Sequence, residues 1–207
     1  MNYNELIQKY PSGVFALSDV LPLFGSKNSA IVTLSRWKRS KKLIKLRNGL
    51  YLLPKLIRKT EPFDLSIASM ILNPSYVSME KAMEYYGLIP EAVFVNTMVT
   101  TRRQNSFKNS LGTFRYFHIK TEYFFGYKTE IVGGQTAYIA FPEKAILDLI
   151  YFKHPQITKA YFWELRLQNV HVIDKKKLLQ FSKRYKSRKI RMAAKMIVAM
   201  INEGAFK

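Results

Sequence analysis

The chain has 207 residues, of which 48% are hydrophobic, and its 34 Lys and Arg against 14 Asp and Glu give a formal net charge of +20. This length and composition support a proper core in one or two domains. The absence of cysteine excludes a disulfide scaffold and thiolate metal sites. The first residues show no export signal and no apolar run approaches the roughly 20 residues of a membrane span, so we expect a cytoplasmic protein without membrane contact.

The basic residues are concentrated at the two ends of the chain. Residues 1–60 hold 12 basic and 2 acidic residues, residues 61–154 hold 9 of each, and residues 155–207 hold 13 and 3. This pattern predicts two separate surfaces for polyanions, or one composite surface if the ends fold together. Nucleic acid, an acidic protein and a membrane face all fit such a balance, and charge alone does not choose among them.

The first 26 residues predict two short helices. One covers residues 2–10, and Ser18 with Asp19 is expected to cap a second helix that runs to Phe24. Residues 25–26 supply the turn before the next helix.

Residues 28–42 predict a longer, cationic helix. Asn28 and Ser29 are candidate caps, and no Gly or Pro interrupts residues 30–42. The apolar face is formed by Ile31, Leu34, Trp37 and the stem of Lys38. The opposite face carries Ser29, Thr33, Arg36, Arg39 and Ser40.

After this helix, residues 44–47 alternate apolar and basic, Asn48-Gly49 follows, and residues 50–52 form a second run. Asn-Gly in this setting predicts a hairpin with a type I′ turn, in which both central residues have positive φ. Three short helices followed by a wing are typical of a winged helix-turn-helix that reads DNA. A solvated surface helix followed by an ordinary hairpin is the plainer alternative.

The DNA-reading interpretation assigns a role to each polar residue of this region. Arg36 and Arg39 are expected to contact guanine edges in the major groove, and Val32 a thymine methyl group. The further expected contacts are Ser29, Thr33 and Ser40 on the helix, Lys27 at the backbone, and Lys45, Arg47 and Asn48 on the wing.

Residues 55–62 predict a linker between a DNA-binding domain (residues 1–58) and a second domain (residues 62–207). In the second domain, residues 62–154 form a neutral mixed core and residues 155–207 a basic helical part. Helices are expected at 63–72, 79–86 and 142–152, and strands at 76–77, 93–100, 113–120, 123–125, 128–132 and 137–140. We therefore expect an α+β fold, with an N-terminal winged helix-turn-helix followed by a mixed α/β domain that ends in basic helices.

The last two predicted helices, at 175–185 and 188–202, are capped by Asp174 and Ser187 and carry ten cations. We call these cations the C-terminal basic surface: Lys175, Lys176, Lys177, Lys183, Arg184, Lys186, Arg188, Lys189, Arg191 and Lys195. A solvated helical face over an apolar stripe is one interpretation, and a site for DNA or another partner is the other, because mutual repulsion costs stability when no partner is present.

No motif of catalysis emerges from the sequence. His118, His154 and His171 match no metal-ligand spacing, and no Gly-rich phosphate loop is present. Glu143 and Asp148 are five residues apart, about 140° around a helix, so they do not converge from one face. Glu143 is better explained as a charge in the first turn of a helix. We expect no enzymatic activity, metal or cofactor.

Three segments in order resemble the AbiE-type antitoxin family, predicted transcriptional regulators of bacterial phage-defence systems. They are residues 49–54 (GLYLLP), residues 76–89, which begin YVS and end YGLI, and residues 140–149 (AFPEKAILDL). The resemblance covers most of residues 14–152 and weakens after Pro155. Lys41 departs from it, since relatives often place a small residue at the end of the recognition helix.

The resemblance implies a winged helix that binds inverted repeats in its own promoter and represses a two-gene operon. It also implies a C-terminal domain that counteracts a nucleotidyltransferase toxin, by a route that need not involve stable contact.

Three alternatives stay open. The chain could be a stand-alone regulator without a toxin partner, or a metal-dependent nuclease that uses Asp148. It could also be an RNA-binding protein that stacks bases on aromatic residues. These aromatic residues are Tyr116, Phe117, Tyr123, Phe124 and Phe125.

Overall fold

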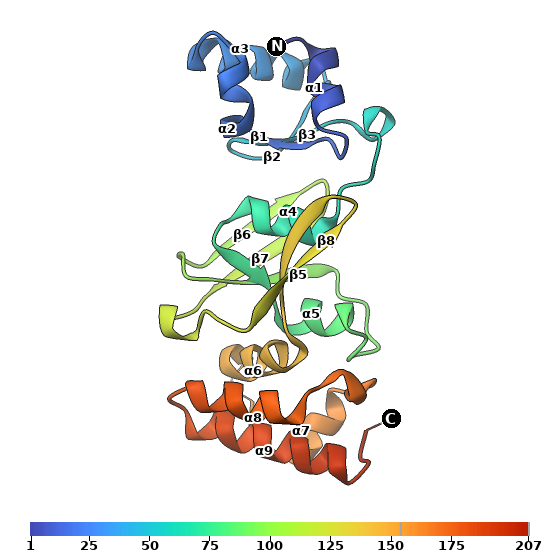
Figure 1. Cartoon of the computed structure of the whole chain (residues 1–207), viewed down its shortest axis with the longest axis vertical. Coiled ribbons are helices and arrows are strands. Elements are labelled where there is room, and N and C mark those ends of the chain that lie inside the picture. The colour runs from blue at the N-terminus through green and yellow to red at the C-terminus, as the bar shows by residue number, and fades with distance from the viewer. Residues whose placement is uncertain (154, 207) are drawn as a thin grey trace.

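The computed structural model describes residues 1–153 and 155–206, and Figure 1 shows this part of the chain as three tiers along its long axis. Within these residues, nine α-helices and two β-sheets form a mixed α+β fold, which confirms the predicted fold class at that level. The N-terminal unit lies at one end, a six-stranded sheet lies in the middle, and the C-terminal helices lie at the other end.

The N-terminal unit combines helices with a small antiparallel sheet of order β1-β3-β2. Its elements are α1 (Tyr3–Lys9), β1 (Val14–Ala16), α2 (Leu17–Val20), η1 (Leu21–Leu23), α3 (Lys27–Arg39), β2 (Ile44–Arg47), β3 (Leu50–Leu52) and η2 (Lys55–Ile57). The helices cover one face of this sheet through a separate apolar cluster of Leu6, Phe15, Val20, Leu34, Trp37, Leu43 and Leu53.

The structure of the first 26 residues differs from the prediction at one strand and one helix start. Strand β1 was not expected, because a three-residue strand is recognisable only through its distant partner β3. Ser18 and Asp19 lie inside α2 and do not precede it. The Asp19 carboxylate instead accepts the backbone N–H of Ala16 at 2.9 Å, and the α-helix ends at Val20.

The middle tier is a six-stranded sheet of order β6-β7-β5-β4-β9-β8, in which the β5–β7 and β4–β9 pairs are parallel. Its elements are α4 (Asp64–Ile71), β4 (Ser75–Val77), α5 (Met79–Tyr85), β5 (Val95–Thr100), β6 (Asn105–Asn109), β7 (Gly112–His118), η3 (Thr121–Tyr123), β8 (Tyr127–Val132), β9 (Gln135–Ala140) and α6 (Pro142–Lys153).

Two strand predictions are corrected here. The expected strand at 123–125 is absent, because Thr121–Tyr123 forms a 3-10 helix and the chain turns before β8. Strand β6 was not expected, because its residues are mostly polar. It is an edge strand with only Phe107 packed on the core, so its sequence lacks an apolar pattern.

Helices cover the two faces of the six-stranded sheet. On one face the Tyr116 hydroxyl donates to the Ala68 carbonyl of α4, and on the other Phe117 packs against Phe152 of α6 at a ring-centroid distance of 5.3 Å. The small sheet packs on the α4 side, where Leu46 and Leu50 join the main core. This shared core joins the first two tiers, and the domain boundary near residues 55–62 stays a prediction.

The third tier consists of α7 (Lys159–Glu164), η4 (Val170–Val172), α8 (Lys175–Arg184) and α9 (Arg188–Asn202), with α8 and α9 packed on α6. Both predicted caps are confirmed. Asp174 accepts the backbone N–H groups of Lys176 and Lys177, and Ser187 accepts that of Ile190. The two basic ends of the sequence therefore lie at opposite ends of the molecule, as two separate surfaces (Figure 1).

Across residues 1–153 and 155–206, none of the helices has the length and apolar composition that crossing a bilayer would require.

Candidate nucleic-acid interface

Helix α3 begins one residue after Ser26, whose hydroxyl accepts the backbone N–H of Ser29 at 3.1 Å. The predicted caps Asn28 and Ser29 therefore lie within the first turn, because Ser26 already satisfies the free N–H group. The helix also ends earlier than expected, at Arg39.

The buried stripe of α3 differs from the prediction. Ala30, Leu34 and Trp37 are buried, at spacings that place them on one face. Ile31, which was expected on this face, is 41% exposed, and Lys38 is exposed. The helix thus rests on small and large apolar residues at i, i+4 and i+7.

The outward face of α3 combines apolar and cationic side chains. Val32 is 67% exposed, and Arg36 and Arg39 lie on the same side of the helix. Neither arginine has an acidic partner among the described residues. This face therefore presents a branched apolar side chain next to two guanidinium groups that can donate hydrogen bonds outward.

Most predicted DNA contacts of this unit are solvent-exposed. The exposed ones are Lys27, Ser29, Arg36, Arg39, Ser40, Lys45 and Asn48. Thr33 is half-buried. The Ser40 hydroxyl donates to the Trp37 carbonyl at 3.2 Å, so it already serves the end of the helix.

Arg47 differs from the other predicted wing contacts. It is half-buried, and its Nε is buried without a hydrogen-bond partner in the described residues. It lies near Tyr116 of the large sheet, where burial raises the pKa of the phenol and the Arg47 charge opposes that rise. Arg47 therefore faces the joint between the two sheets, where the small sheet packs on the large one.

The hairpin turn also differs from the expected type I′. Gly49 has a φ of +77°, but Asn48 does not take a positive φ. The β2–β3 register shifts by one residue between Lys45 and Arg47. The turn thus joins the antiparallel strands β2 and β3 with one residue in the left-handed conformation and a β-bulge.

The end of α3 carries a strained residue. Lys41 has a φ of +59°, a left-handed conformation that favours glycine. Its backbone N–H donates to the Lys38 carbonyl at 3.1 Å. A glycine would therefore suit this position better than the lysine that occupies it.

The C-terminal basic surface contains cations of two kinds. Lys177 lies over the Phe141 ring at 3.6 Å and Arg184 over the Phe125 ring at 3.5 Å, so both pack on aromatic residues. Three more have polar partners: Lys175 contacts Asn202, Lys186 contacts Glu122, and Arg191 contacts the Tyr185 carbonyl. The Lys176 charge helps to lower the pKa of the Asp174 carboxyl. It belongs to the remaining five, which form no ion pair and lie over no aromatic ring within the described residues: Lys176, Lys183, Arg188, Lys189 and Lys195.

A fully buried polar cluster ties the third tier to the sheet. The Lys144 ammonium contacts the Asp148 carboxylate one turn away on α6, and both side chains have no exposed surface. Asp148 also accepts hydrogen bonds from Tyr76 at 3.0 Å, Ser78 at 2.8 Å and Tyr185 at 2.8 Å. Sequence analysis missed this cluster, although an i, i+4 Lys–Asp pair on an apolar helix is a signal for it.

Burial shapes the ionisation of this cluster. Desolvation lowers the pKa of Lys144, and the Asp148 charge offsets part of that change. Desolvation and the Asp148 charge raise the pKa of Tyr76 and Tyr185 well above the ordinary value. The cluster is therefore a closed structural network in which a carboxylate has its acceptor positions filled.

Glu143 and Asp148 were predicted not to converge on one site, and in the structure the two carboxylates contact different partners. Glu143 accepts the backbone N–H of Asp174 at 2.7 Å, so it anchors the start of α8. A nuclease built on Asp148 would require this buried cluster to open. In residues 1–153 and 155–206 no three His, Cys, Asp or Glu side chains are grouped as metal ligands, and His154 lies outside these residues.

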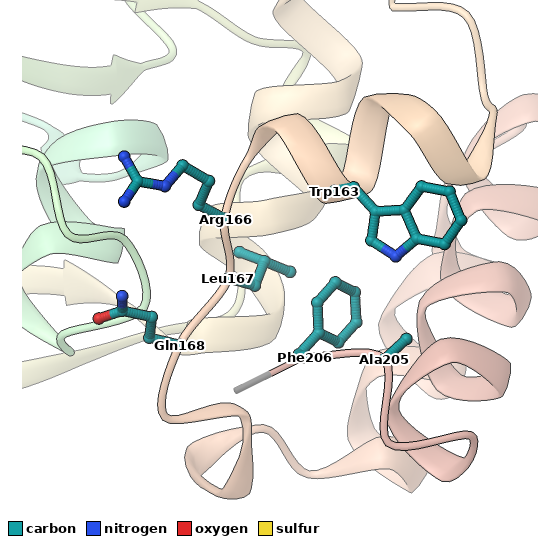
Figure 2. Close-up of a pocket in the computed structure, with 6 residues that line it drawn as sticks. All are labelled: Trp163, Arg166, Leu167, Gln168, Ala205 and Phe206. Atoms are coloured by element: carbon teal, nitrogen blue, oxygen red, sulfur yellow. The ribbon is translucent and has the colours of Figure 1, made fainter.

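A small pocket of about 330 Å³ lies beside the C-terminal end of the described chain. In Figure 2, Leu167, Phe206 and Trp163 gather around it, while Arg166 points away. Arg166 pairs with Glu91 at 3.2 Å, so the one cation at this pocket already has a partner.

No protein-family model matches the chain, and no curated protein matches it.

Proposed function

We propose that residues 1–58 form a winged helix-turn-helix and that the chain is a DNA-binding repressor and antitoxin. In this proposal α3 enters the major groove, β2 and β3 form the wing, and the operator consists of inverted repeats upstream of the gene. The protein acts in the cytoplasm, without enzymatic activity, metal or cofactor.

The outward face of α3 is the observation that carries the proposal. The exposed Val32 offers a methyl surface that suits apolar contact with a thymine methyl group. Arg36 and Arg39 lie beside it with free guanidinium groups, which match guanine edges. Lys45 and Asn48 remain exposed on the wing, and we assign Arg47 to the joint between the sheets instead of DNA.

The aromatic residues that favoured RNA binding are engaged elsewhere. Tyr116, Tyr123 and Phe125 are buried, and Phe117 and Phe124 pack against the main core. Stacking of RNA bases requires exposed rings. Their position supports duplex DNA over RNA as the ligand.

The test uses the full chain and the DNA upstream of its gene, with a shuffled duplex of equal length as reference. Arg36→Ala should weaken binding to the upstream DNA by about 1–3 kcal/mol and leave the shuffled duplex little changed. Lys9→Ala, an exposed cation on α1, is the matched control and should change neither. Equal weakening on both duplexes would show that Arg36 reads no base.

The antitoxin part of the proposal is supported by the resemblance to the AbiE-type family. It predicts that expression of the chain rescues cells arrested by a nucleotidyltransferase toxin encoded beside it. A failure to rescue, together with intact repression of a reporter, would favour the stand-alone regulator.

A further inference from the structure

The electrically neutral centre of the sequence contains a group of unpaired cations. Of the nine Lys and Arg in residues 61–154, four form ion pairs: Lys81, Lys128, Lys144 and Lys153. The other five are exposed and form no ion pair within the described residues, although the Lys120 charge helps to lower the pKa of the nearby Glu122. We call them the sheet cations: Arg102, Arg103, Lys108, Arg115 and Lys120.

The strand register places two sheet cations on the α6 side of the sheet. Arg115 pairs with Ser106 and lies on the same face of β7 as Phe117, which packs against Phe152 of α6. Lys108 lies two residues along β6 from Ser106 and shares this face. Since α8 and α9 also pack on α6, these cations lie on the side of the C-terminal basic surface.

A chain of contacts joins the remaining sheet cations to α9. The His118 ring at the end of β7 hydrogen-bonds the Arg102 carbonyl at 3.0 Å, which holds the β5–β6 loop beside that end. Lys120 lies two residues after His118, and Glu122 of η3 pairs with Lys186 at 3.4 Å. The Lys186 backbone N–H also donates to the Tyr123 hydroxyl at 3.1 Å, just before α9 begins.

A groove of about 410 Å³ runs along the β6 edge within this group. It is lined by Gln104, Asn105, Ser106, Arg115, Tyr116 and Phe117. Amide, hydroxyl and guanidinium groups are suitable donors to phosphate oxygens. The aromatic members are largely unavailable for stacking, since Tyr116 is buried and Phe117 packs on Phe152.

We propose that the sheet cations and the C-terminal basic surface form one continuous surface that holds the phosphate backbone of duplex DNA. This inference rests on the proposed function and adds a second contact, away from α3, on the middle and third tiers of the molecule. Single strands bind through stacking on exposed aromatic rings, which the groove lacks. An interface with a protein partner has an apolar centre. Met192 is the one large apolar side chain exposed on α8 and α9, so this surface favours DNA over a protein partner.

The experiment compares full-length Arg102→Ala/Arg103→Ala with the wild type on the upstream and shuffled duplexes across a salt series. Each lost phosphate contact makes the slope of log affinity against log salt concentration shallower by about 0.9. Between 50 and 200 mM salt, the fall in affinity of the double variant should therefore be about 12-fold smaller than that of the wild type. Both duplexes should be affected equally. Lys81→Ala/Lys153→Ala is the matched control, because these cations are already paired, and should keep the wild-type slope.

Arg102→Gln/Arg103→Gln should show the same salt dependence of DNA affinity as the alanine variant. Its melting curve, followed by circular dichroism, separates loss of charge from loss of fold. An unchanged slope, with Arg36→Ala still weakening the upstream duplex, would overturn this inference and leave the proposed function standing. A change confined to single-stranded DNA or RNA would also overturn it. If Arg36→Ala had no effect on either duplex, the proposed function itself would fail.

Discussion

The outward face of α3 and the C-terminal basic surface carry the same kind of charge in different surroundings. Both ends of the chain have ten more basic than acidic residues, since 12 exceeds 2 and 13 exceeds 3 by the same amount. On α3 the arginines lie beside an exposed Val32. On α8, Lys177 and Arg184 pack over phenylalanine rings.

This difference separates two uses of a cation. An arginine beside an exposed methyl-bearing side chain offers shape and hydrogen bonds, which base recognition requires. A cation over an aromatic ring stabilises the fold, and neighbouring cations without such a contact offer only charge to a phosphate backbone. Equal net charge thus does not imply equal function.

The largest effect is expected where the third tier attaches to the sheet. Asp148→Asn leaves the Lys144 ammonium buried without its counter-charge, so the free energy of unfolding should fall by about 3–5 kcal/mol. Urea denaturation measures this change. Glu91→Gln, at an exposed pair with Arg166, is the control and should cost about 1 kcal/mol or less. A similarly small loss for Asp148→Asn would mean that solvent reaches the buried pair.

The ends of the two long helices differ in strain. After α9, the left-handed position is occupied by Gly204 at a φ of +66°, whereas Lys41 occupies it after α3. Lys41→Gly should therefore stabilise the protein by about 1 kcal/mol and raise Tm by roughly 2–4 °C. Lys42→Gly, at a residue without positive φ, should give no gain. A lower Tm for Lys41→Gly would show that Lys41 is not strained.

The smallest expected effect is the difference in stability between variants of two neighbouring cations of α8. Arg184→Ala removes the contact with Phe125 and should lower the free energy of unfolding by about 0.5–1 kcal/mol. Lys183→Ala, at an exposed residue without a partner in the described chain, should leave it within about 0.5 kcal/mol. Thermal melts of the two variants, run side by side, would contradict this account if their order were reversed.

The sequence predicted those elements whose signals are local. The apolar period and the caps Asp174 and Ser187 predict α8 and α9, and the alternation around Asn48-Gly49 predicts the β2–β3 hairpin. The residue that caps the N-terminus of α3 was harder to predict. Ser26, Asn28 and Ser29 all have suitable side chains, and only the path of the preceding turn selects Ser26.

Features that depend on tertiary contacts could not be read from the sequence. The polar edge strand β6 exists through pairing with β7, and Arg47 is withdrawn from the outer surface of the β2–β3 hairpin because the two sheets pack together. The partners of Asp148 come from β4, the residue after it, and the end of α8. The neutral net charge of residues 61–154 likewise hid the sheet cations, since Glu61, Glu91 and Glu122 pair with cations outside this segment.

The central claim is that α3 reads bases while the C-terminal basic surface supplies affinity without sequence preference. The direct measurement is the ratio of affinities for upstream and shuffled DNA, determined for Arg36→Ala and for Lys183→Ala/Arg188→Ala. Arg36→Ala should lower this ratio by about 5- to 150-fold, and the C-terminal double variant should leave it unchanged while weakening both complexes. A ratio that falls in the C-terminal variant and holds in Arg36→Ala would contradict the account.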